Sequence, residues 1–329
     1  MMSLEPDFQQ ADARIQPRFA GVRTFARLRH VPSASGLEGV DVAVLGFPFD
    51  TATSYRTGAR FGPEAVRSAS VLLRPYHATH AVDVFGTLNC VDAGDVPVAP
   101  GDTVETFARA QVELERVADS NVFPLVIGGD HSITLAELRV LAGRHGPLAL
   151  VHLDAHGDTW DEYFGQPYFH GTTFRRALEE GLIDPQASIQ AGLRGPLYAE
   201  SDIGEAREMG FTVLSAEDLR ALGAGAYGDL VRARVGDRPA FLTFDVDFCD
   251  PTVTPGTGTP EIGGFSSAEA QGFVRALVGL SFVGADVVEV SPSYDGPGQI
   301  TALLAANIAW EILALLALRR RDREQTSAS

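Results

Sequence analysis

Residues 147–158 read PLALVHLDAHGD, an apolar run that ends in two aspartates and a histidine at alternate positions. The run at 147–151 has the composition of a buried strand, and Asp154, His156 and Asp158 follow it. Because alternate side chains of an extended chain point the same way, these three groups are expected to converge on one small volume. Gathering buried carboxylates without a cation is costly. The segment therefore predicts a strand with a metal site at its end.

Apolar, β-rich runs of this kind alternate with helical patterns along the chain. Strands are expected at residues 42–47, 88–92, 124–127, 148–153, 188–192, 211–214, 240–244 and 284–290. Helices are expected at residues 63–73, 103–119, 132–144, 171–181, 200–209, 225–235, 266–279 and 299–318. Several of the strands are continuously apolar, as in sheets that are covered on both faces. The alternation predicts an α/β fold with a mostly parallel sheet flanked by helices.

The two ends of the chain differ from this pattern. Residues 1–38 are irregular and are expected to form an N-terminal arm rather than a domain. The tail at 319–329 is polar and is expected to fray. Residues 39–318 are expected to form a single catalytic domain, which no repeat or low-complexity block interrupts.

Composition and charge narrow the classes of function. The 329 residues, 45% hydrophobic and 21% charged, fit a soluble globular protein, and a net charge of −17 argues against a nucleic-acid partner. No uninterrupted apolar run approaches the length of a membrane span, so no membrane partner is expected. Cys90 and Cys249 are far apart and form neither a disulfide framework nor a zinc motif. A cytoplasmic protein is the simplest interpretation.

Ligands of open parallel sheets bind beyond the carboxyl ends of the strands. Besides the opening motif, three other expected strands end in ionisable groups, which include His131, Asp245, Asp247 and Glu289. The ordinary alternatives for such residues are helix capping, core packing and strand-end ion pairs. Four strand ends that deliver such groups to one rim of the sheet favour a shared site.

Six of these groups are candidate metal ligands, two histidines and four aspartates. They are His131, Asp154, His156, Asp158, Asp245 and Asp247. Imidazole combined with carboxylate suits Mn²⁺, with Fe, Co, Ni or Zn as possible substitutes. Six side chains are too many for one open metal, but they suit two ions roughly 3.5–4 Å apart, a spacing that activates a water molecule. His152 is interpreted as a buried, hydrogen-bonded residue, and Asp130 and Asp250 as structural hydrogen-bonding residues.

Three motifs resemble, in order and spacing, the signatures of the ureohydrolases, a family that includes arginase, agmatinase, guanidinobutyrase and proclavaminate amidinohydrolase. They are GGDHS at 128–132, DAHGD at 154–158 and DVD at 245–247. SYRTGARFGP at 54–63 and PGTGTP at 255–260 extend the resemblance, which spans residues 40–318. The resemblance implies a three-layer α/β/α sandwich with a mostly parallel sheet of roughly eight strands. It also implies trimers or hexamers and hydrolysis of a guanidino compound to urea and an amine.

The resemblance further implies residue roles. One manganese ion would be held by His131, Asp154, Asp158 and Asp245, and a second by His156 and Asp247, with Asp154 and Asp245 bridging the two. His170 matches the family histidine that shuttles protons, and an imidazole titrates in the range that this role needs. Glu289 matches the carboxylate that binds the planar guanidinium. The alternatives are a surface-loop histidine and a strand-end ion pair.

The substrate is less defined by the sequence. Segments 170–176 and 289–295 look more like agmatinase, guanidinobutyrase and proclavaminate amidinohydrolase than arginase, so agmatine is expected, with a guanidino acid as the alternative. The aromatic loop at 159–169 is expected to wall a pocket for an apolar chain. An inward-pointing arginine would favour the acid, and a further carboxylate would favour the amine. The candidates are Arg56, Arg175 and Arg194 for the first, and Asp161 and Glu162 for the second.

Two departures from the commoner family residues concern the pocket. Phe248-Cys249 follows the DVD motif, and Gly157 lies inside the DAHGD motif. A bulky Phe248 beside the site is interpreted as narrowing or reshaping the pocket. Neither departure removes a candidate ligand.

Two other classes of function were weighed. A non-catalytic metal or guanidine binder could keep the fold, but an intact set of six ligands speaks against it. A metal-dependent phosphoesterase also uses two metals, but the four motifs contain no basic group to bind a phosphate.

Overall fold

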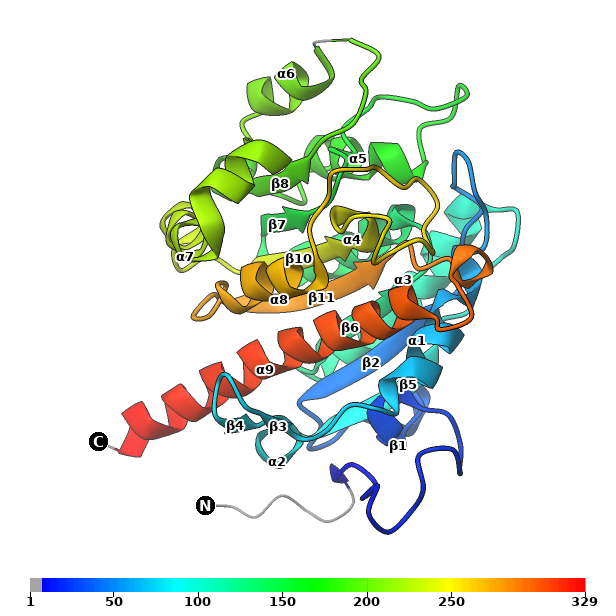
Figure 1. Ribbon diagram of the computed structural model, residues 1–329, viewed down its shortest axis with the longest axis vertical. Coiled ribbons are helices and arrows are strands. Elements are labelled where there is room, and N and C mark those ends of the chain that lie inside the picture. The colour runs from blue at the N-terminus through cyan, green and yellow to red at the C-terminus, as the bar shows by residue number, and fades with distance from the viewer. Residues whose placement is uncertain (1–7, 200, 329) are drawn as a thin grey trace.

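The computed structural model describes residues 8–199 and 201–328 (Figure 1). In these residues, nine strands form one sheet in the order β1-β5-β2-β6-β11-β10-β7-β8-β9, and every neighbouring pair runs parallel. The strands are β1 (Arg29–His30), β2 (Val42–Phe47), β5 (Cys90–Asp95), β6 (Phe123–Gly128), β7 (Ala149–Leu153), β8 (Ile189–Leu193), β9 (Thr212–Ser215), β10 (Ala240–Asp245) and β11 (Phe282–Val288).

Helices cover both faces of the sheet and complete a three-layer sandwich, as predicted. One face carries α1 (Gly62–Ser70), α7 (Ala216–Val235), α8 (Ser267–Arg275) and α9 (Ile300–Ala328). The other face carries α3 (Thr103–Asp119), α4 (Thr134–His145), α5 (Thr173–Glu179) and α6 (Ser201–Glu208). The central strands are buried throughout, which explains why they read as continuous apolar runs.

All eight expected strands are present, and the ninth strand comes from the expected arm. β1 pairs with β5, and Phe25 beside it is completely buried in the core. Part of residues 1–38 therefore packs as an integral element, while the boundaries of the domain stay a prediction. A two-residue strand is too short to give a periodic signal, so the sequence pattern did not indicate it.

α9 continues through most of the tail that was expected to fray, because it runs to Ala328. Its segment Ile300–Gln325 is long and apolar enough to cross a membrane by length and composition. However, 72% of its most apolar window is buried inside the protein, where α9 packs against α1 and α8. The helix therefore has the position of a core helix.

Other short elements were not expected from the sequence. A hairpin of β3 (Tyr76–His77) and β4 (Val82–Asp83) leads into the single turn α2 (Val84–Thr87). α7 begins at Ala216, earlier than the expected residue 225, because Ser215 and Asp218 form a capping box. The helical dihedral angles of α7 are interrupted at Gly223, so the apolar pattern of the helix is divided into two parts.

The four strands that precede the candidate site are neighbours, in the order β6-β11-β10-β7. In the register of the sheet, Phe244 lies beside Leu153, and Asp245 beside Val288. The carboxyl ends of these strands therefore meet at one edge of the sheet, where a parallel sheet is expected to bind its ligands.

Candidate metal centre

The six predicted ligands come together at this edge. His131 opens a turn of 3-10 helix directly after β6, and Asp245 ends β10 and caps the turn that contains Asp247. Asp154, His156 and Asp158 follow β7. The side chains of five of the six are largely buried, and that of His156 is 29% exposed. The structure thus confirms the predicted convergence of these six side chains.

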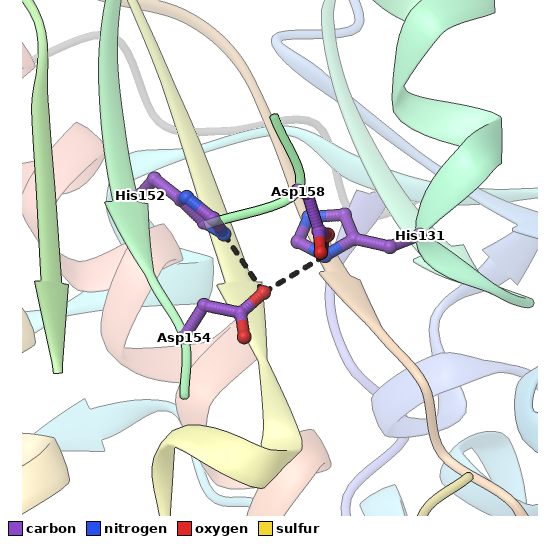
Figure 2. Close-up of side chains that lie close together, drawn as sticks. All are labelled: His131, His152, Asp154 and Asp158. Atoms are coloured by element: carbon purple, nitrogen blue, oxygen red, sulfur yellow. Dashed lines mark hydrogen bonds and ion pairs between the residues drawn. The ribbon is translucent and has the colours of Figure 1, made fainter. Parts of the chain in front are cut away.

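Three carboxylates surround one nitrogen of His131. The Nδ1 atom lies 3.0 Å from Asp154 Oδ2, 2.9 Å from Asp158 Oδ2 and 3.4 Å from Asp245 Oδ2. Figure 2 shows Asp154 and Asp158 pointing to this side of the ring. Although it is buried, Nδ1 has no well-oriented hydrogen bond among the described residues. Buried polar atoms are rarely left without a partner, so a cation that all four groups share fits this arrangement.

A second cluster forms around His156. Its Nδ1 atom lies 3.0 Å from Asp247 Oδ2 and 3.4 Å from Asp154 Oδ1. Asp247 Oδ2 is buried and has no hydrogen-bond partner among the described residues. The two oxygens of Asp154 face different clusters, Oδ2 toward His131 and Oδ1 toward His156. A carboxylate placed in this way would offer one oxygen to each cluster if both clusters held an ion.

The pKa values of buried groups in the centre also indicate that it favours bound positive charge. Burial, together with Asp247 and Asp154, raises the pKa of Asp245 well above its usual range, and burial raises the pKa of Asp247 to about 6. Burial alone would lower the pKa of His131, but the close carboxylates of Asp154, Asp158 and Asp245 raise it well above its usual value. The metal-free site therefore takes up protons where divalent ions would otherwise neutralise the carboxylates.

His152 is buried and hydrogen-bonded, in agreement with its interpretation. Its Nε2 atom lies 2.8 Å from Asp154 Oδ2, and its Nδ1 atom lies 3.2 Å from the amide nitrogen of Gln190. Figure 2 shows the side chain of Asp154 pointing toward that of His152. Gln190 also donates to the Gly157 carbonyl at 2.6 Å. Gln190 was not among the predicted site residues, although a glutamine inside the apolar run of β8 was the available signal.

The two predicted structural aspartates accept several backbone hydrogen bonds. Asp130 accepts from the amides of Ser132 at 3.0 Å and Ala52 at 2.9 Å, which fixes the turn before His131. Burial and the charge of Glu289 raise the pKa of Asp130 to about 7. Asp250 accepts from the amides of Thr252, Gly263 and Gly264, and it ties the loops after β10 together.

His170 and Glu289 form a pair beside the centre. His170 Nδ1 lies 2.9 Å from Glu289 Oε1, and its Nε2 accepts the amide hydrogen of Ser54 at 3.0 Å. With Nε2 accepting, the neutral ring carries its proton on Nδ1 and donates it to Glu289. Burial alone would lower the pKa of His170, but Glu289 raises it to a value above the usual one.

Glu289 has one occupied oxygen and one free oxygen. Oε1 also accepts the His131 amide at 2.9 Å, whereas Oε2 is buried and has no hydrogen-bond partner among the described residues. The backbone of Glu289 has a φ of 64°, an unusual value for a residue with a side chain, and its amide donates to the Gly129 carbonyl at 2.8 Å. Such strain is typical of functional sites, where the surrounding structure holds it.

Gly129 makes this arrangement possible. It adopts a φ of 25°, and a Cβ at this position would lie 2.5 Å from the Phe47 carbonyl and 2.6 Å from that of Phe49. Only glycine fits so close an approach of two backbones. The second glycine of GGDHS therefore brings the loop after β2 against the loop after β6.

A cavity of about 600 Å³ opens onto the centre. Its lining includes His156, Asp158 and His170 together with aromatic side chains of the loop at 159–169, which confirms the predicted aromatic wall. Trp160 and Tyr163 pack against each other, and the hydroxyl of Tyr163 lies 3.3 Å from that of Tyr198 on the opposite loop. The aromatic wall thus continues across two loops at the mouth of the cavity.

Two of the three arginines weighed for substrate binding line the cavity. Arg194 donates to backbone carbonyls with all its nitrogens. Among the described residues, Arg56 has ring contacts but no hydrogen bond, with its guanidinium 5.0 Å from the centre of Tyr294 and 5.4 Å from that of Tyr55. Arg175 does not line the cavity and pairs instead with Glu179.

The two weighed carboxylates lie outside the cavity lining. Asp161 pairs with Arg176 at 2.6 Å, and Glu162 is exposed. Two carboxylates that the sequence analysis had not named, Asp202 and Glu261, line the cavity instead. Glu261 follows the PGTGTP motif directly, so proximity to that motif was a signal for it.

Phe248 does not shape the cavity, so this expectation was wrong. Its side chain is completely buried, stacks on Phe265 with ring centres 4.5 Å apart, and contacts Phe244 and Phe273. The ring packs in the hydrophobic core, and Phe248 ends the 3-10 turn Val246–Phe248 that follows Asp245. Gly157 does line the cavity.

The comparisons with known proteins agree with this geometry. Residues 40–315 match the model of the arginase family. The chain is 46% identical to guanidinopropionase of Pseudomonas aeruginosa, with 94% of this chain and 96% of that protein covered. It is 44% identical to proclavaminate amidinohydrolase of Streptomyces clavuligerus, with 96% and 99% covered, and 41% identical to mitochondrial agmatinase of Gallus gallus, with 92% and 88% covered. The solved structure of the Streptomyces enzyme matches with a TM-score of 0.88 at 45% identity, over 92% of this chain and 99% of that one.

Proposed function

The chain belongs to the arginase family and is a hydrolase that acts on the C–N bonds of guanidino compounds, and we propose that its substrate is a linear guanidino acid. We further propose that two Mn²⁺ ions occupy the centre. The observation that carries the proposal is a two-cluster His/Asp centre that shares a cavity with His170, which contacts Glu289. The buried Oε2 of Glu289 has no hydrogen-bond partner among the described residues.

In this proposal, His131, Asp154, Asp158 and Asp245 would hold one ion, and His156, Asp247, Asp154 and Asp245 would hold the other. The donor set fits, because it combines two imidazoles with four carboxylates that balance two divalent charges. When bound, two such ions activate a water molecule for attack on the guanidinium carbon.

Glu289 orients the guanidinium group. Its Oε1 is held by the protein, and its Oε2 is free to accept an N–H of the substrate. A carboxylate opposite a planar cation fixes the orientation of that cation as well as its position. The central carbon would then face the metal centre.

His170 supplies the proton that the departing amine requires. The carboxylate of Glu289 favours the charged imidazolium, and His170 lines the cavity next to the site proposed for the guanidinium. A positioned imidazolium can protonate the amine as the C–N bond breaks, which yields urea and the free amine.

Arg56 supports an acid as the substrate. Arg56 lines the cavity, its guanidinium lies over the rings of Tyr55 and Tyr294, and it makes no hydrogen bond among the described residues, so its donors are available to a carboxylate. Arg194 differs, because the protein already occupies its donors. The names of the Pseudomonas and Streptomyces relatives, guanidinopropionase and proclavaminate amidinohydrolase, agree with an acid.

Agmatine is the second candidate, and the presence of Glu261 in the cavity favours it. A carboxylate there would attract the terminal ammonium of agmatine. The sequence ranked agmatine first, and the name of the Gallus gallus relative agrees with it. Because Arg56 lines the cavity, we propose a guanidino acid as the substrate in preference to agmatine.

The remaining properties are also proposals. The family resemblance supports a homo-oligomer, a trimer or a hexamer. The acidic composition and the lack of a cysteine framework support a cytoplasmic enzyme without nucleic-acid or membrane partners.

The test is urea release from 4-guanidinobutyrate, 3-guanidinopropionate, agmatine, arginine and guanidine, with Mn²⁺ and Ni²⁺ compared. We expect a guanidino acid to give the highest kcat/KM, and Arg56→Gln to lower that value while it spares agmatine. Agmatine as the best substrate, unaffected by Arg56→Gln, would select the second candidate. No urea from any compound would refute the proposed function as a whole.

A further inference from the structure

Glu261 is a partly buried carboxylate of the cavity lining, and it has no role in the reaction proposed for a guanidino acid. Its Oε1 atom lies 3.9 Å from Nε2 of His156, whose other ring nitrogen faces Asp154 and Asp247. The imidazole is therefore placed between the metal centre on one side and Glu261 on the other. The Glu261 side chain is 24% exposed and shares the cavity lining with His156.

Arg194 holds the loop that carries Glu261. Its guanidinium donates to the carbonyls of Glu261 at 2.9 Å and Ile262 at 3.2 Å. The same group donates to the carbonyls of Asp247 at 2.5 Å and Cys249 at 3.1 Å. One side chain thus joins the loop of Glu261 to the turn that contains the second aspartate of the DVD motif.

This network occupies the donors of Arg194. Further hydrogen bonds reach the carbonyls of Gly192 at 3.3 Å and Phe248 at 3.2 Å. A planar guanidinium has five N–H donors in a fixed geometry, so all of its directions are engaged by backbone. Arg194 therefore acts as a fixed support and leaves no donor for a substrate.

Gly195 provides the space in which the Glu261 carboxyl group lies. It has a φ of 88°, and a Cβ built on it would come within 2.5 Å of the Glu261 carboxyl carbon. A side chain at this position would therefore displace the carboxylate and would also be strained. The position of Glu261 depends on a glycine in the neighbouring loop.

We propose that Glu261 is a positioning residue that orients His156 toward the metal centre, with Arg194 and Gly195 holding it in place. The inference rests on the role of His156 as a ligand in the proposed function. A carboxylate that faces the outer nitrogen of a ligating histidine favours one orientation and tautomer of the ring and makes it a better ligand. At 3.9 Å, Glu261 is within ion-pair range of His156 Nε2 but beyond a direct hydrogen bond. In this role the negative charge of Glu261 acts on His156 and not on a bound substrate.

The alternative is that Glu261 binds the ammonium end of a substrate such as agmatine. The two roles predict different measurements. A positioning role changes the affinity for the second metal ion whatever the substrate is, whereas a substrate role changes KM for cationic substrates and leaves metal binding unaltered.

The experiment compares Glu261→Gln with Asp202→Asn, which removes another carboxylate of the cavity lining. Asp202 accepts the amide hydrogens of Tyr198 and Ala199 and is a matched control for the loss of one charge. Manganese-loaded wild type and variants are equilibrated at graded concentrations of free Mn²⁺, and the bound ions per chain are counted. The spectrum of the coupled manganese pair is recorded by electron paramagnetic resonance.

We expect Glu261→Gln to bind one of the two ions about 10- to 100-fold more weakly, the range typical of changes behind a ligating histidine. The coupled signal should fade at free Mn²⁺ concentrations that saturate the wild type, whereas Asp202→Asn should retain both ions. Gly195→Ala should weaken the binding of the same ion, although it leaves Glu261 in the protein. This variant therefore tests whether the position of the carboxylate matters, and not only its presence.

Retention of both ions by Glu261→Gln with wild-type affinity would overturn the inference, as would an equal loss in Asp202→Asn. A rise in KM for agmatine alone would assign Glu261 to the substrate. Counting bound metal requires no catalytic turnover. These outcomes can therefore be told apart from a failure of the proposed function, which would appear as a wild-type protein that releases no urea. Wild-type protein that binds a single ion would remove the ligand role of His156 and the inference with it.

Discussion

Glu289→Gln probes the link between the metal centre and the guanidinium group. The substitution keeps size and shape, and it leaves an oxygen to accept the two donors that now reach Oε1, the His131 amide and His170 Nδ1, both at 2.9 Å. It replaces the free Oε2 by an NH₂ group, which cannot accept from a guanidinium.

The loss is therefore at least one charge-assisted hydrogen bond, worth about 1.5–3 kcal/mol. Because about 1.4 kcal/mol corresponds to a tenfold change, kcat/KM should fall by about 10- to 150-fold. The content of bound manganese should not change, because Glu289 is not among the proposed ligands.

The assay is initial-rate urea release from manganese-loaded wild type and variant, with bound metal counted in the same samples. Glu289→Asp is a matched control that keeps the charge but withdraws the carboxylate. A Glu289→Gln variant that keeps both ions and loses less than about threefold in kcat/KM would refute the assignment of Glu289 to the guanidinium. A loss of activity that follows a loss of metal would instead make Glu289 a support of the centre.

Three further predictions follow from the same geometry. His170→Asn should lower kcat by about 10²–10⁴-fold with both ions retained, and the fall in wild-type kcat at high pH, where the imidazolium loses its proton, should disappear from its pH profile; a normal rate would exclude a proton-donor role. Phe248→Ala should lower the free energy of unfolding by about 3–5 kcal/mol in denaturant titrations and leave the ranking of substrates unchanged, because the ring fills the core; an altered ranking would return Phe248 to the pocket. In metal-free protein, the pKa of Asp130, raised from 3.8 to about 7 chiefly by burial, makes the folded state bind a proton that the unfolded chain releases. The stabilisation from that proton is complete below pH 3.8 and is lost as the pH rises through about 7. The unfolding free energy of wild type relative to Asp130→Asn should therefore fall as the pH rises over this window. A rise in this difference would contradict a raised pKa of Asp130.

The larger elements of the fold could be predicted from the sequence because burial on both faces makes a strand continuously apolar. Residues 42–47 and 103–119 were expected within the bounds that β2 and α3 have. β1 was missed because its two exposed residues owe their conformation to pairing with β5 and not to their own pattern. The start of α7 was missed because an interruption at Gly223 separates it from the apolar pattern that follows.

The metal cluster was predictable because period-two spacing at strand ends brings side chains together through local geometry alone. Glu261 and Gln190 were not, since each reaches the centre from a separate loop or strand and only the tertiary fold brings it there. The direction of Phe248 depends on the turn after Asp245, which a residue-by-residue comparison with family motifs does not reveal. Local spacing thus predicts ligands better than it predicts the residues that support them.

The most direct test of the central claim is a titration of metal-free protein with Mn²⁺ while urea release from a guanidino acid is followed. The account predicts that activity appears with metal and reaches its maximum at two ions per chain, and that Asp154→Asn, which alters the carboxylate facing both clusters, abolishes it. Full activity at one ion per chain, or urea release without added metal by protein verified to be metal-free, would contradict the two-metal centre.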